Sequence, residues 1–151
     1  MGDDQFGTSA QSSWLREWVD LTTVPYDGRV TSQELDAYFD DRPESWEVFV
    51  ILVERINALG EAEMTVDSQI SFGRQRKFAW FWLYNVTSRN PSGVPHLMLA
   101  LDHERQSEHV RGVSQVGKHR WNHQIVLRTA ADARSQWLGE FLALAYQYGG
   151  G

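Results

Sequence analysis

The run KFAWFWLYN, residues 77–85, holds five aromatic side chains among nine residues and decides which fold we expect. Alternate residues of a β-strand point to opposite faces of a sheet, so the run divides into two sets. One face is predicted to carry Phe78, Trp80, Trp82 and Tyr84. The other face is predicted to carry Ala79, Phe81 and Leu83. Both sets are apolar, which is unusual for a strand with one face in water.

Outward from this run, the sequence alternates with a period of two in several further segments. They are residues 63–67, 69–73, 96–102 and 120–128, and a further short strand is expected near residues 109–116. Short segments with polar residues, glycine or proline separate them, as in antiparallel hairpins. We therefore expect an antiparallel meander of about five strands.

Helical patterns stand before and after these strands. Thr31 opens a capping box, and Pro43 suits the first turn of a helix that ends near Gly60. After the strands, Thr129 and Asp132 repeat the capping-box spacing ahead of an amphipathic run. This order predicts an α+β fold, in which the meander is flanked by N-terminal helices and one C-terminal helix.

The length and composition limit the classes of protein to consider. The chain has 151 residues, which suits one domain. We expect a disordered tail over residues 1–12, from its polar composition, and a single α+β domain over residues 13–148. The absence of cysteine excludes a disulfide, a thiolate nucleophile and a cysteine zinc site. No secretory signal and no run of about 20 apolar residues occurs, so we expect a cytoplasmic protein without a membrane partner.

The net charge of −6 hides a division along the chain. Residues 1–67 carry fifteen acidic and four basic side chains, whereas residues 68–151 carry five acidic and ten basic ones. Several basic residues could form a patch near the aromatic strand, and they are Arg74, Arg76, Lys77, Arg105, Arg111, Lys118 and Arg120. Such a patch would suit single-stranded nucleic acid. The simpler interpretation is that these charges balance the acidic helices, which makes nucleic acid the less favoured partner.

The strand over residues 96–102 indicates which sheet face is the core. Every second residue there is leucine, and we expect this leucine side to pack on the helix over residues 43–59. The aromatic face then lies on the opposite side, joined by a few polar groups. The predicted ligand-binding residues are Gln69, Ser71, Arg74, Phe78, Trp80, Trp82, Tyr84 and Met98. One interpretation is that an N-terminal helix covers this face through Trp14 and Trp18, and the other is that part of the face stays open as a pocket. Both hold if that helix is a lid over the pocket.

His96 and His123 are the candidate catalytic residues, because they lie on predicted strands and can exchange a proton near neutral pH. We expect no metal site. His119 and His123 lie roughly 13 Å apart along an extended strand, too far to share one ion. No glycine-rich phosphate loop or nucleophile motif occurs, so no cofactor is predicted. The sequence leaves open whether the protein is an enzyme.

Two blocks of the sequence resemble a known family. They are SQISFGRQRKFAWFW, residues 68–82, and HRWNHQIVLRTAADARSQWLGEFLALAY, residues 119–146. Both are similar to segments of a small bacterial domain of unknown function, DUF5655. The resemblance covers residues 33–148 and implies the same fold along that length. This chain lacks the N-terminal zinc knuckle that some members carry.

We therefore predict a bacterial protein that binds a small apolar or aromatic molecule on its aromatic sheet face, as an accessory or catalytic protein of a biosynthetic pathway. The alternative is an interaction module that presents a basic and aromatic surface to nucleic acid or to another protein. An oligomer is compatible with either function. Salt separates the two ligand classes, because phosphate-backbone binding weakens steeply with salt whereas stacking on aromatic walls changes little.

Overall fold

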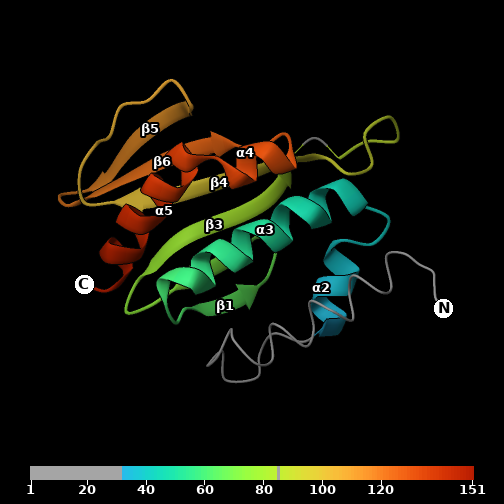
Figure 1. The fold of residues 1–151 in the computed structure, drawn as a ribbon, viewed down its shortest axis with the longest axis horizontal. Helices are drawn as coiled ribbons and strands as arrows, with labels where there is room; N and C mark the ends of the chain where they lie inside the picture. Colours follow the sequence, from blue (N-terminus) through green and yellow to red (C-terminus); the bar gives the residue numbers. More distant parts are fainter. Residues whose placement is uncertain (1–31, 85) are drawn as a thin grey trace.

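The computed structural model describes residues 32–84 and 86–151, whose arrangement is drawn in Figure 1. The tail predicted over residues 1–12 and the helix predicted around Trp14 and Trp18 lie outside these ranges. The helices are α2 (Ser32–Tyr38), α3 (Pro43–Leu59), α4 (Ala130–Arg134) and α5 (Gln136–Gly149). The strands are β1 (Glu63–Val66), β2 (Ile70–Gly73), β3 (Lys77–Tyr84), β4 (Val94–Leu101), β5 (Val110–Gly117) and β6 (Arg120–Val126).

The six strands form one antiparallel sheet in the order β1-β2-β3-β4-β6-β5. The predicted α+β class is confirmed, and β1 to β4 form the expected meander. The order then departs from a meander, because β6 returns between β4 and β5. The short strand expected near residues 109–116 is a full edge strand of eight residues. Its side chains are mostly exposed, so no apolar alternation marked it in the sequence.

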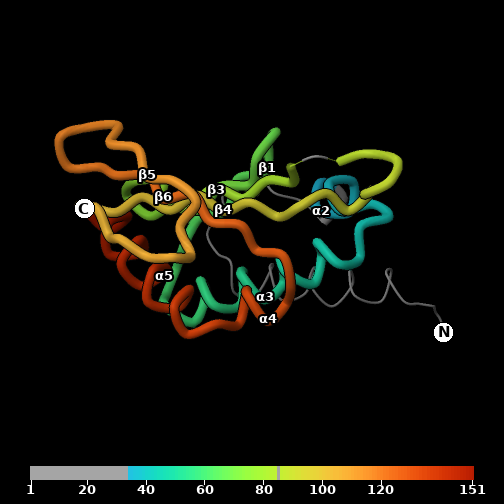
Figure 2. Tube along the Cα trace, turned by 90° about the horizontal axis from the view of Figure 1, so that it is seen from above, coloured from blue at the N-terminus to red at the C-terminus, as the bar shows by residue number. Residues whose placement is uncertain are grey.

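Helices α3, α4 and α5 all lie on one side of the sheet, as Figure 2 shows from above. The opposite side carries no part of these three helices, and we call it the open face. The strand registers place nine residues together on it: Ser71, Trp80, Trp82, Tyr84, His96, Met98, Asn122, Gln124 and Val126. The fold therefore has two sheet faces with different surroundings.

The helix-covered face forms the core. Leu97, Leu99 and Leu101 are fully buried there, as the alternation predicted. They belong to a strand that packs mainly beneath α5 and to a smaller extent against α3, so the expected packing on the helix from Pro43 is correct only in part. On β3, the Phe81 ring lies 5.3 Å from the ring of Phe49 in α3. Aromatic and leucine side chains thus join the sheet to both long helices.

Helix α3 begins at Pro43 and ends at Leu59, as predicted. The next residue, Gly60, has a φ of 147°, a backbone conformation that side chains oppose. A Cβ atom there would clash with the hydroxyl of Tyr146. That hydroxyl donates a hydrogen bond to the Glu61 carbonyl, at 3.0 Å, so glycine allows α5 to contact the chain directly after α3.

The C-terminal helix is divided at Ser135. Thr129 caps its first turn as predicted, since its hydroxyl accepts from the Asp132 N–H at 3.2 Å. Ser135 then takes extended backbone angles, and α5 starts at the next residue. Arg55 of α3 donates 2.7 Å hydrogen bonds to the carbonyls of Ala133 and Ser135. The Ser135 carbonyl also accepts from the Gly139 N–H at 3.3 Å, so Arg55 joins α3 to the last turn of α4 and to the first turn of α5.

The core assignment predicts the effect of truncating Leu99. Leu99→Ala should lower the free energy of unfolding by about 2–5 kcal/mol, because the site is fully buried and a cavity would remain. Val116→Ala is the control, since 52% of Val116 is exposed on β5, and its change should stay within about 1 kcal/mol. Chemical denaturation measures both. Equal small changes in the two variants would contradict the assignment of the leucine face to the core.

Candidate functional site

The open face arranges its side chains in rows across the strands. Ser71, Trp80, Met98 and Gln124 stand opposite one another on β2, β3, β4 and β6. Trp82 and His96 form part of the next row, and Tyr84 pairs with Val94 in the row after that. The predicted sharing of one face is therefore confirmed for Ser71, Trp80, Trp82, Tyr84 and Met98, and His96 lies on the same face. Their role in ligand binding stays a prediction.

A cavity of about 480 Å³ lies at one end of this face. Its lining residues come from β3, β4, β5, β6 and the segment after β6, and they are Tyr84, Val94, His96, Arg111, Gln124 and Arg128. Tyr84 is 60% exposed. The cavity thus combines an accessible aromatic ring with a histidine, an amide and two guanidinium groups, which is a mixture typical of ligand sites.

His96 is held in place by its own strand and by two aromatic rings. It is only 7% exposed, and its ring centroid lies 5.4 Å from that of Trp82 and 5.1 Å from that of Tyr84. Its Nδ1 atom lies 3.1 Å from the Val94 carbonyl oxygen. A carbonyl only accepts, so Nδ1 carries the proton in the neutral ring and Nε2 is left as an acceptor. No described residue donates to Nε2.

Trp80 occupies the middle of the open face and is half-buried. The guanidinium group of Arg120 lies 5.0 Å from the centroid of its ring, a cation–π distance. Arg120 is oriented by a 3.1 Å hydrogen bond from its Nε to the side-chain oxygen of Asn122. A basic group and an aromatic ring therefore meet outside the cavity as well.

Phe78 does not share the open face, which corrects the prediction from alternation. Phe72 of β2 stands opposite Ala79, whereas Gly73 stands opposite Lys77, so Phe78 is an extra residue in the pairing. Such a bulge interrupts the period of two. The Phe78 ring is fully buried, 5.7 Å from the ring of Tyr146 in α5, and belongs to the helix-covered core.

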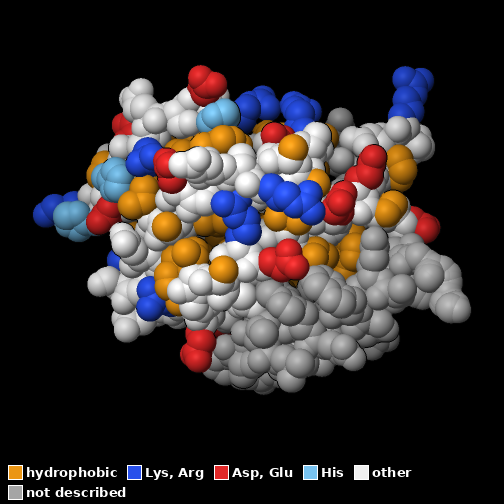
Figure 3. Space-filling model, viewed as in Figure 1, with side chains coloured by type: hydrophobic (Ala, Val, Ile, Leu, Met, Phe, Trp, Pro, Cys, Tyr) orange, Lys and Arg blue, Asp and Glu red, His pale blue; other side chains and the backbone are white. Residues whose placement is uncertain are grey.

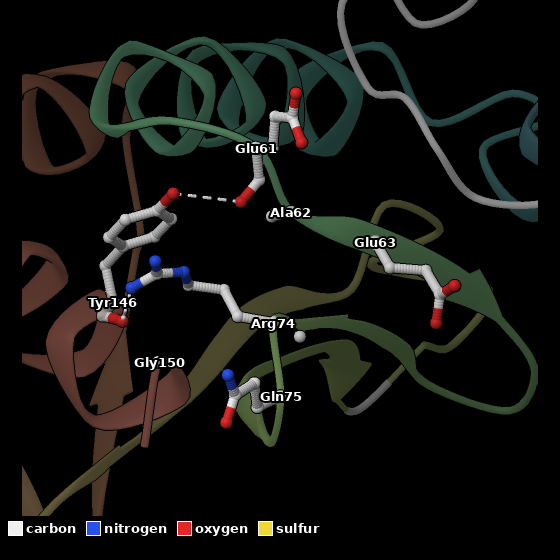
Figure 4. Close-up of a pocket in the computed structure, with 8 residues that line it drawn as sticks. Glu61, Ala62, Glu63, Arg74, Gln75, Tyr146 and Gly150 are labelled. Carbon is white, nitrogen blue, oxygen red and sulfur yellow. Dashed lines mark hydrogen bonds between the residues drawn. The ribbon is translucent and has the colours of Figure 1, made fainter.

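Arg74 is also remote from the Tyr84–His96 cavity. Figure 4 shows its guanidinium group beside Tyr146, with a second cavity of about 520 Å³ around it. The group lies 4.0 Å from the Tyr146 ring centroid and donates a 3.0 Å hydrogen bond to the Tyr146 carbonyl. Arg76 donates in the same way to the Tyr148 carbonyl, at 2.7 Å. Both arginines therefore complement the negative C-terminal end of α5.

Gln69 precedes β2, in the turn that joins it to β1. Its carbonyl accepts a hydrogen bond from the Asp67 N–H, at 2.9 Å, and it does not line the Tyr84–His96 cavity. Trp80, Trp82, Met98 and Ser71 lie along the open face without being among the residues that line that cavity. The structure thus brings Tyr84 and His96 together at one cavity and sets the other predicted ligand residues beside it or away from it.

His123 lies on the helix-covered face, away from His96. It is fully buried, its Nδ1 lies 3.1 Å from the Trp121 carbonyl, and its Nε2 accepts a 2.9 Å hydrogen bond from the Arg105 N–H. Burial lowers the pKa of His123 below its usual value, and the hydrogen bond to Trp121 opposes this shift to a smaller extent. Both ring nitrogens are engaged, so His123 anchors the segment that leads from β4 to β5.

The predicted basic patch is divided among three places. Arg74 and Arg76 cap α5, while Arg105 forms a 3.0 Å ion pair with Glu140 of that helix. Arg111 and Arg120 lie on the side of the open face. The helix side, shown in Figure 3, presents acidic and basic side chains interspersed. Part of the basic charge therefore balances helix groups, and part of it stays beside the aromatic residues.

Four lining residues of the cavity were not among the predicted ligand-binding or catalytic residues, although one of them, Arg111, was named as part of the basic patch. Gln124 and Arg128 are two and six residues after Asn122, so continued alternation over residues 120–128 carried a usable signal for both. Val94 was missed because β4 begins two residues before the predicted start.

Across the described ranges, no group of three His, Asp or Glu side chains could hold a metal ion. No helix there is long and apolar enough to cross a membrane.

The environment of His123 predicts a pH dependence of stability. Its folded-state pKa lies below the usual 6.5, so the unfolded chain binds the proton more readily. The free energy of unfolding should therefore be highest above about pH 6.5 and fall as the pH drops through that value. His123→Gln should show a shallower fall in denaturation midpoint, whereas His119→Gln, at an exposed position, should follow the wild type. Parallel curves for His123→Gln and the wild type would refute this assignment.

The comparisons with known proteins bear on the family rather than on the ligand. Comparison with curated proteins and with solved structures found no match. Residues 35–149 match the family described as Domain of unknown function (DUF5655). This range begins within α2 and ends with α5, so it includes every strand of the sheet and the cavity on its open face. The chain therefore belongs to the DUF5655 family.

Proposed function

We propose that this protein binds a small molecule with a flat apolar or aromatic group in the cavity lined by Tyr84 and His96. The observation that carries the proposal is the combination of an exposed aromatic ring with a nearly buried imidazole at one cavity. The volume of about 480 Å³ falls within the range of small-molecule sites. Aromatic and polar groups that converge on such a space are characteristic of ligand recognition.

Tyr84 supplies the surface for a flat ligand. An exposed aromatic ring contributes apolar area and favours stacked or edge-on contacts with a second ring. The nearly buried ring of His96 packs against Tyr84, at a centroid distance of 5.1 Å. A ligand that stacks on Tyr84 would therefore meet a wall whose position is fixed by β3 and β4.

His96 and Gln124 supply the polar recognition. The Nε2 atom of His96 accepts a hydrogen bond in the neutral ring, and the amide of Gln124 both donates and accepts. The same imidazole nitrogen could take a proton from a bound ligand, so catalysis by His96 stays a prediction. The cytoplasmic location and the role in a biosynthetic pathway also stay predictions from the sequence.

Neutral flat probes test the proposal. Indole and quinoline should shift the side-chain signals of His96 and Tyr84 in a saturable manner in a selectively labelled NMR titration. Tyr84→Ala should raise Kd roughly two- to tenfold, because it removes a stacking contact of about 0.5–1.5 kcal/mol. Tyr84→Phe is the matched control and should retain the affinity, since it keeps the ring. Titrations without any shift at His96 or Tyr84 would reject the proposal.

The interaction module remains the second candidate, because Arg120 lies over Trp80 on the same face. A single-stranded oligonucleotide would use both the ring and the cation. Its affinity should fall steeply between about 50 mM and 200 mM salt, whereas binding of indole should change little. Strong oligonucleotide binding with that salt dependence, and no binding of neutral probes, would favour the interaction module. A protein partner on this face would instead lower the solvent exposure of the Tyr84 and Trp80 side chains together.

A further inference from the structure

A smaller cavity of about 210 Å³ adjoins the Tyr84–His96 cavity beside β5 and β6. It is lined by His109, Arg111, Val126, Arg128, Asp132 and Trp137. Arg111 and Arg128 line both cavities. These two arginines therefore lie at the junction of the two cavities.

Local backbone structure directs both arginines to this point. The pairing of β5 with β6 shifts between Val110 and Gly112, so Arg111 is the extra residue of a bulge. Bulges re-aim a side chain out of the regular alternation. Arg128 follows β6, and its N–H donates a 2.9 Å hydrogen bond to the Asp132 carboxylate, which fixes its backbone against the start of α4. Strand pairing thus sets the position of Arg111, and a hydrogen bond from its own backbone to a side chain sets that of Arg128.

The charges of the two arginines are not balanced at this junction. In the described part of the chain, no hydrogen bond or ion pair joins either guanidinium group to another side chain. Asp132 is the single carboxylate among the described residues that line the two cavities. It already accepts from the Arg128 backbone, and its own N–H donates to Thr129. The junction therefore has more positive than negative charge and free hydrogen-bond donors.

We propose that the ligand of the Tyr84–His96 cavity carries an anionic group, a phosphate or a carboxylate, which binds between Arg111 and Arg128. This inference rests on the proposed function and specifies the chemical class of its ligand. A guanidinium group matches both anions, because it forms two parallel hydrogen bonds to their oxygens. A phosphate monoester offers three terminal oxygens and close to two negative charges, enough to engage both arginines at once.

The two ends of the junction differ in what they offer to the rest of the ligand. On one side Tyr84 has an exposed ring, which suits a flat group. On the other side the rings of His109 and Trp137 are stacked on each other, with centroids 4.2 Å apart and planes within 5°. Since these two rings already form a stacked pair, the flat group belongs on the Tyr84 side. The anion then points toward the smaller cavity.

Matched probes test this inference. The ligands are phenol, benzoate and phenyl phosphate, which share one ring and differ in charge, together with inorganic phosphate as a competitor. Binding to the full chain is followed by NMR at His96 and Tyr84. Phenyl phosphate or benzoate should bind about tenfold or more tightly than phenol, because charged hydrogen bonds are added. Arg111→Gln and Arg128→Gln should each remove most of that advantage, so that the charged probes and phenol bind to either variant with similar affinity.

Arg120→Gln is the matched control, since Arg120 lies on the same face but does not line either cavity. It should leave the affinity for phenyl phosphate unchanged. Thermal denaturation checks that all three variants fold. Competition by inorganic phosphate, together with weak benzoate binding, would identify a phosphate ligand. Tight benzoate binding without competition by inorganic phosphate would identify a carboxylate ligand. Either result supports the inference.

Two results would overturn the inference and leave the proposed function intact. One is equal binding of phenol and both charged probes. The other is tight binding of a charged probe that neither Arg111→Gln nor Arg128→Gln weakens. Failure of every probe, phenol included, to shift His96 or Tyr84 would reject the proposed function together with the inference. If all three arginine variants lose the same fraction of their affinity for an oligonucleotide, the face binds nucleic acid instead.

Discussion

Packing of the long helices on one face of the sheet is the constraint on which the rest of the structure depends. α3 and α5 bury alternate residues of the central strands, such as Phe81 and Leu99, which are fully buried. Full burial of a side chain of this size contributes about 1.5–3 kcal/mol. Because strand residues alternate, the residues between them must face the opposite side, where those helices give no cover. The core thereby dictates that Trp80, Trp82 and His96 lie on the open face.

This dependence explains what could be predicted from the sequence. The leucines of β4 and the alternating run of β3 identified both faces because alternation is a local property of each strand. The bounds of α3 followed from Pro43 and Gly60, which act through their own backbone preferences. The insertion of β6 between β4 and β5 was not predictable in this way. Strand order depends on pairing between distant segments, and an edge strand with exposed side chains carries little apolar pattern.

Two of the three register shifts in the described sheet account for the main differences at the candidate site. One bulge takes Phe78 out of the alternation of β3 and places it in the core against α5. The other takes Arg111 out of the alternation of β5 and brings it to the cavity beside Tyr84. A bulge inserts one residue and reverses the expected face at that point. Composition does not reveal such an insertion. The sequence analysis therefore assigned Phe78 to the aromatic face and did not include Arg111 among the ligand-binding residues.

His96 and His123 show how the two faces give one residue type different chemistry. Each ring directs Nδ1 to the carbonyl two residues earlier, at 3.1 Å, so the local geometry and the neutral tautomer are the same. On the helix-covered face, the Nε2 of His123 accepts from a backbone N–H and burial lowers its pKa. On the open face, the Nε2 of His96 has no donor among the described residues. The strand geometry is thus common to both. The face decides that His123 anchors the segment after β4, while the Nε2 of His96 stays without a donor among the described residues.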